Sequence, residues 1–112
     1  MNDQTQTEIK ISTLKLIYTA LLPTYYKLQS LLGDVLSKSY IISDYDRSLL
    51  LEQCSVSLAL KCLFEEYFRE AEEAQVKTLH LKEEEFMTVL SLAKSVEVAE
   101  RTMYKNIGIW TH

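Results

Sequence analysis

The sequence predicts an all-α protein, a helical bundle of four to five helices that forms a single domain over residues 1–112. A length of 112 residues is typical of one compact domain. Two glycines and one proline supply almost no turn residues for β-hairpins, and no strictly alternating apolar run is long enough for a strand. Apolar residues instead recur at spacings of three and four, which is typical of helices with one buried face.

The first part of the chain predicts two helices that meet at a proline. Residues 1–7 are expected to form a frayed tail. Residues 8–22 carry apolar side chains at helical spacing: Ile9, Leu14, Ile17, Tyr18 and Leu21. Pro23 suits the first turn of a helix, so we expect a second helix from Pro23 to about residues 37–40.

A long third helix is expected over about residues 44–75. Ser43 is placed to cap its N-terminus, with Asp46 three residues later in a capping-box arrangement. Apolar residues, with Leu58 and Cys62 among them, cover much of the surface outside the main stripe in its first half. We therefore expect this half to be buried on nearly all sides, as the spine of a helical body over residues 8–76.

Composition and charge exclude several classes of protein. A net charge of −4 disfavours a protein that coats nucleic acid by charge alone. No apolar run approaches the ~18 residues of a membrane span, and the N-terminus lacks a secretory signal, so we expect a soluble cytoplasmic protein without membrane contact. Cys54 and Cys62 lie about 12 Å apart if they share a helix, so we expect free thiols.

The sequence predicts neither a catalytic nor a metal site. The glutamates of residues 65–73 are interpreted as a solvated helix face, because neither His80 nor His112 follows a glutamate by three residues, as a di-iron bundle requires. No phosphate-binding loop, Ser-His-Asp set or Cys-His cluster is present. We therefore expect no enzymatic activity, no metal and no cofactor.

The last quarter of the chain predicts a further helix and then a distinctive pattern. Three glutamates begin the helix, and its apolar face follows: Phe86, Val89, Leu90, Ala93 and Val96. Residues 92–107, LAKSVEVAERTMYKNI, then place Leu92-Ala93, Val98, Thr102-Met103 and Ile107 at set spacings. This pattern, over residues 82–107, resembles the helix-turn-helix DNA-binding motif. Glu97 holds the turn position that the family usually gives to glycine, and Ala99 holds the usual place of the capping serine.

The resemblance implies two short helices over residues 81–108 with a turn at Glu97. Ala93 would allow close approach of the helices, Val98 would plug the turn, and Met103 and Ile107 would face inward. The outward residues of the second helix would then be Glu100, Arg101, Tyr104 and Lys105.

The function implied by this resemblance is duplex-DNA binding by a transcriptional or replication regulator that dimerises. Arg101, Tyr104 and Lys105 would contact DNA, and Lys94 would add a flanking phosphate contact. The acidic balance of the chain favours an alternative, a helical protein–protein interaction module without DNA binding. Its partner would be a second copy of the chain or another protein.

Overall fold

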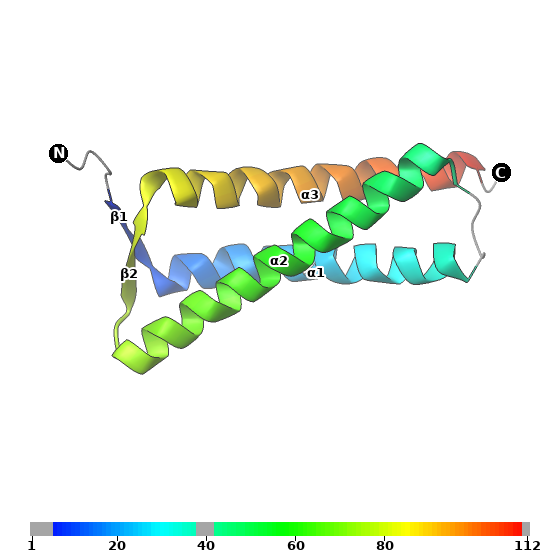
Figure 1. Cartoon of the computed structure of the whole chain (residues 1–112). Helices are drawn as coiled ribbons and strands as arrows, with labels where there is room; N and C mark the ends of the chain where they lie inside the picture. Colours follow the sequence, from blue (N-terminus) through cyan, green and yellow to red (C-terminus); the bar gives the residue numbers. More distant parts are fainter. Residues whose placement is uncertain (1–5, 38–41, 111–112) are drawn as a thin grey trace.

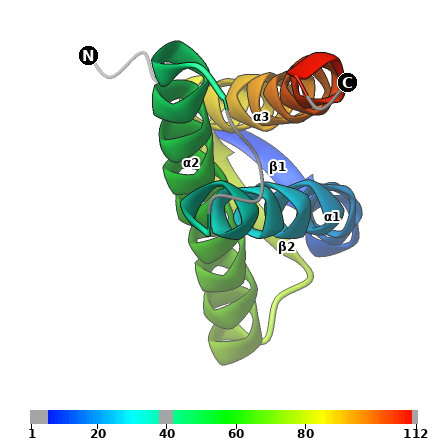
Figure 2. The same ribbon diagram turned by 90° about the vertical axis from the view of Figure 1, so that its right-hand side faces the viewer.

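The computed structural model describes residues 6–37 and 42–110, with side chains described up to Lys105. The elements follow one another as β1 (Gln6–Lys10), α1 (Ile11–Leu36), α2 (Asp44–Ala74), β2 (Thr78–Lys82) and α3 (Glu83–Trp110). The helices α1 and α3 run in the same direction, and α2 returns diagonally across both of them on one side (Figures 1 and 2). The prediction of mostly helical structure is confirmed, but the predicted bundle of four to five helices is wrong.

The predicted boundary at Pro23 is absent, because α1 continues through it with Pro23 inside the helix. Proline lacks an N–H group, so the helix loses one backbone hydrogen bond at this point. Leu14, Leu21 and Leu28 are all buried, and their spacing of seven keeps them on the face that packs against α2. Tertiary packing on both sides of Pro23 therefore holds the two predicted helices together as one.

A two-stranded antiparallel sheet, which the sequence did not predict, joins the starts of α1 and α3. In its register Thr7 faces Leu81 and Ile9 faces Leu79. Ile9 and Leu81 are buried in the core, whereas the alternate residues of both strands are exposed. Residues 6 and 7, predicted to belong to a frayed tail, lie in β1, and residues 1–5 lie outside the described part of the chain.

The core consists of apolar side chains that repeat in steps of three and four along the helices. In α2 the buried residues are Leu50, Gln53, Cys54, Ser57, Leu60, Phe64, Tyr67 and Ala71. This spacing is typical of helices that pack at shallow angles with interlocking side chains. Ser43 caps α2 as predicted, since its Oγ accepts a hydrogen bond from the N–H of Asp46 at 3.1 Å.

The outward side of α2 is more exposed to solvent than the sequence predicted. Leu51 and Leu58 are 48% and 44% exposed, and Cys62 is also exposed. The first half of α2 is therefore buried along one face and not on nearly all sides, because among the described elements α1 and α3 pack against this one face. Both cysteines are free thiols, as predicted.

The molecule is extended and thin for its length. Its radius of gyration is 16.8 Å and its principal extents are 54 × 30 × 17 Å, whereas a compact domain of this length has a radius of gyration of about 13 Å. A body one or two helices thick leaves apolar side chains on its surface, and Tyr26, Leu51, Met87 and Val98 are among those exposed. Within the described residues, no helix combines the length and apolar character needed to cross a membrane.

Candidate functional site

The four residues predicted to contact DNA lie on one continuous helix. The α3 helix runs unbroken past Glu97, and in the described part of the chain Gln75 is the one non-glycine residue with positive φ. The predicted turn at Glu97 is therefore wrong. Val89, Val96 and Met103 explain the continuity, because they are spaced by seven and all are buried, which requires a single straight face.

The predicted roles of two hydrophobic residues in the motif have different outcomes. Met103 is buried, as predicted. Val98, predicted to plug the turn, is 49% exposed because no second helix folds back over it. The side chain of Ile107 lies outside the described residues.

Two of the predicted DNA-contacting cations are paired with one carboxylate. The Glu97 side chain forms ion pairs with Lys94, at 3.6 Å, and with Arg101. All three side chains lie on the surface of α3, so the positive charge expected there is partly offset. Lys105 is also exposed, and it has no ion-pair partner among the residues that the structure describes.

Glu100 and Tyr104 link α3 to α1 and do not both face outward as predicted. Glu100 is buried at 7% exposure, and its Oε1 lies 3.5 Å from the Nζ of Lys27 on α1. The hydroxyl of Tyr104 donates a hydrogen bond of 3.3 Å to the backbone carbonyl of Lys27, although its ring is 43% exposed. These contacts position α3 beside α1. They also engage the polar groups of both side chains, which are then less available to contact DNA.

A shallow groove between α2 and α3 is the feature that the sequence did not reveal. This α2–α3 groove has a volume of about 600 Å³ and is lined by Leu49, Gln53, Ser91, Lys94, Ser95, Val98, Ala99 and Thr102. On the α3 side, small residues follow one another at helical spacing, with Lys94 and Val98 between them: Ser91, Ser95, Ala99 and Thr102. A wall of small residues allows the backbone of another helix to approach closely.

Gln53 makes this groove unusual. Its side chain occupies a core position of α2 between Leu50 and Ser57, and it is only 7% exposed. Its Oε1 has no hydrogen-bond partner among the described residues. A buried polar atom left in this state costs about 1–3 kcal/mol. A glutamine within a heptad pattern whose other members are apolar or, as at Ser57, small was the sequence signal that could have marked this position.

The second half of α2 is linked to α1 and α3 by polar contacts. Glu65 accepts hydrogen bonds from the hydroxyl of Tyr18 on α1, at 2.7 Å, and from the Nζ of Lys61, at 2.9 Å. The Tyr18 hydroxyl, and then Lys61, lower the pKa of Glu65. Tyr67 donates to Glu85 on α3 at 2.9 Å, and burial together with this bond raises the pKa of Tyr67. These polar atoms already have partners, so they contrast with Gln53.

No part of the described chain gathers three or more histidine, cysteine, aspartate or glutamate side chains that could hold a metal ion. The α2–α3 groove with Gln53 is therefore the candidate site on which function is argued. Comparisons of the chain with protein family models, curated proteins and solved structures find no match.

Proposed function

We propose that the chain is a helical protein–protein interaction module whose α2–α3 groove packs against the same groove of a second copy. The observation that carries this proposal is the buried and unpartnered Oε1 of Gln53 in the wall of the groove. This oxygen is closed off from solvent in the single chain, so on association the Gln53 side chain would turn into the groove, where a partner supplies the missing donor.

A second copy is the partner that fits the chemistry of an amide. The glutamine side chain carries both an N–H donor and a carbonyl acceptor, so two copies of Gln53 related by a two-fold axis can each satisfy the other. Ser91 and Ser95 add hydroxyl groups that can donate and accept across the same axis, whereas the hydroxyl of Thr102 already donates to the carbonyl of Val98 at 2.9 Å and can only accept. Buried polar side chains of this kind set the register of paired helices.

The shape and surface of the chain also support association. The body is thin, and Val98 exposes apolar surface at the edge of the groove. Covering such a groove would bury apolar surface, which is the main driving force for association. The unpartnered oxygen of Gln53 and the exposed apolar surface of Val98 therefore both favour dimerisation through the groove.

Duplex-DNA binding by the α3 surface stays a prediction. Glu97 offsets charge on Lys94 and Arg101, and the predicted turn that would present a separate recognition helix is absent. Among the four residues, Lys105 is the cation whose charge no carboxylate of the described chain offsets. The interaction module has the stronger support, because two of the three cations predicted to contact DNA, Lys94 and Arg101, already pair with Glu97.

Sedimentation equilibrium over a range of concentrations tests the proposal. Wild type should form a dimer, and Ser95→Arg should weaken the dimer by about 100-fold or more, because it places an unpaired charge in the interface. The matched control is Thr19→Arg, which puts the same side chain on an exposed position of α1 away from the groove. A wild type that remains monomeric, or a dimer that Ser95→Arg leaves unchanged, would contradict the proposal.

A further inference from the structure

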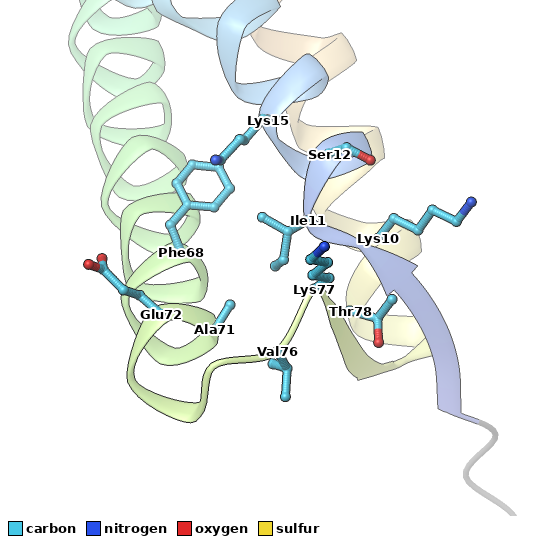
Figure 3. Close-up of a pocket in the computed structure, with 10 residues that line it drawn as sticks. All are labelled: Lys10, Ile11, Ser12, Lys15, Phe68, Ala71, Glu72, Val76, Lys77 and Thr78. Carbon is cyan, nitrogen blue, oxygen red and sulfur yellow. The ribbon is translucent and has the colours of Figure 1, made fainter.

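A second cavity lies at the end of the molecule that carries the sheet, away from the α2–α3 groove. It has a volume of about 630 Å³ and lies between the start of α1, the end of α2 and the segment that leads into β2 (Figure 3). Ile11, Phe68, Ala71 and Val76 give it an apolar lining. We call this cavity the basal pocket, and it shares no lining residue with the groove.

The walls of the basal pocket are fixed by backbone hydrogen bonds. Gln75 adopts the left-handed conformation with φ 56° and ends α2. The chain then turns back, and the N–H of Val76 donates to the carbonyl of Ala71 at 3.0 Å. The N–H of Ile11 donates to the carbonyl of Lys77 at 2.8 Å, which ties this turn to the start of α1. The pocket is therefore formed before any ligand arrives.

Positive charge that lacks a counter-ion gathers around this pocket. Lys10, Lys15 and Lys77 line it, against one carboxylate, that of Glu72. Among the described residues none of these three lysines takes part in an ion pair. The five cations that do are placed elsewhere: Lys27, Lys61, Arg69, Lys94 and Arg101.

The lysines differ in how they lie around the apolar lining. Figure 3 shows Lys15 beside the ring of Phe68, between α1 and α2, and Lys77 beside Ile11 at the start of α1, whereas Lys10 extends away from Phe68. Lys15 and Lys77 are therefore the two ammonium groups placed to contact a ligand that rests on the apolar lining. Lys10 adds positive potential from farther away.

We propose that the basal pocket binds a small organic anion, with an apolar ring or short chain against Phe68 and Ile11 and a carboxylate, sulfonate or phosphate group at Lys15 and Lys77. The volume lies in the range of about 300–1,000 Å³ that is typical of small-molecule sites. An apolar lining with a few charged groups at its rim selects amphipathic ligands, because each part of the ligand meets a matching surface. In a chain of net charge −4, local positive charge is what attracts an anion to this end.

Fluorescence titration of the full chain with anilinonaphthalene sulfonate tests the site, and the neutral phenylnaphthylamine serves as the matched probe without the anionic group. Wild type should bind the sulfonate more tightly than the neutral probe. Lys15→Gln/Lys77→Gln should weaken sulfonate binding by about tenfold, because two cation–anion contacts are lost, and should change neutral-probe binding by less than about twofold. The control Arg101→Gln/Lys105→Gln removes the same charge from α3, at positions that line neither the basal pocket nor the α2–α3 groove, and should leave sulfonate affinity unchanged.

A second variant changes the charge of the pocket at a different lining residue. Val76 is 43% exposed, so Val76→Glu should fold, as circular dichroism would verify, while its carboxylate repels the sulfonate and weakens its binding. Three results would overturn the proposal: equal sulfonate affinity of wild type and the Lys15/Lys77 variant, an equal loss in the α3 control, or neutral-probe binding as tight as sulfonate binding. Ser95→Arg should bind the sulfonate like wild type, so failure of the dimer proposal would remain distinguishable from failure of this one.

Discussion

Glu65 on α2 accepts a hydrogen bond from the hydroxyl of Tyr18 on α1, and it accepts a second one from Lys61 on its own helix. Its pKa is lowered because both donors stabilise the ionised carboxylate. A carboxylate whose pKa is lower in the folded state adds stability above its unfolded pKa, about 4.3, and loses that contribution as the pH falls through its folded pKa. The stabilising effect of this link is therefore expected at neutral pH and not in acid.

Glu65→Gln should accordingly lower the melting temperature at pH 7, and the difference from wild type should shrink as the pH falls below about 4.3. Thermal unfolding followed by circular dichroism between pH 7 and pH 3 measures this. The control is Glu66→Gln, whose carboxylate pairs with Arg69 on the same helix and does not join α1 to α2. A difference between Glu65→Gln and wild type that stays constant across the pH range would contradict the assignment.

The two cysteines should differ strongly in reactivity. Cys54 is buried, its Sγ donates a hydrogen bond to the carbonyl of Leu28 at 3.4 Å, and burial raises its pKa. Cys62 is exposed. Since the thiolate is the reactive form, native protein should consume one equivalent of dithiobis-nitrobenzoate rapidly and a second only after unfolding. Cys62→Ser should abolish the rapid phase, and two rapid thiols per native chain would contradict the packing of Cys54.

Two substitutions by glycine should change the free energy of unfolding in opposite directions, and they test the backbone conformation of α3 and of the end of α2. Glu97 lies inside α3, so Glu97→Gly should destabilise the protein by about 1 kcal/mol. Gln75 ends α2 with φ 56°, so Gln75→Gly should stabilise it by a similar amount, because glycine adopts this conformation without strain. Urea unfolding of both variants measures the two signs. A stabilising Glu97→Gly would instead indicate the turn that the helix-turn-helix resemblance implies.

The apolar face of each helix and the cap at Ser43 could be predicted from the sequence, because both depend on residues close together in the chain. The continuity of α1 through Pro23 and of α3 through Glu97 could not, since distant core contacts outweigh the local preference for a break. The strands were missed because each is only five residues long and its partner lies about 70 residues away. The groove at Gln53 was missed because it exists only where α2 crosses α3.

For the whole molecule, a net charge of −4 disfavours attraction to the phosphates of DNA. With Lys94 and Arg101 paired to Glu97, the interaction-module proposal expects weak binding of labelled duplex DNA at low salt. It also expects Arg101→Ala/Lys105→Ala to bind like wild type. Titrations at increasing salt measure this. Wild-type affinity that falls with log salt at about −0.9 per phosphate contact, with a shallower slope for the double variant, would favour the DNA-binding prediction.

The thin shape of the chain favours self-association, and the surface that mediates it can be located directly. Two-dimensional ¹H–¹⁵N NMR spectra recorded over a dilution series report which amides change environment as copies separate. Dimerisation through the α2–α3 groove should give concentration-dependent shifts at Gln53, including its side-chain amide, and at Ser95 and Ala99, with Leu51 and Leu58 on the outward side of α2 unchanged. Shifts confined to Leu51 and Leu58, or spectra that do not depend on concentration, would contradict it.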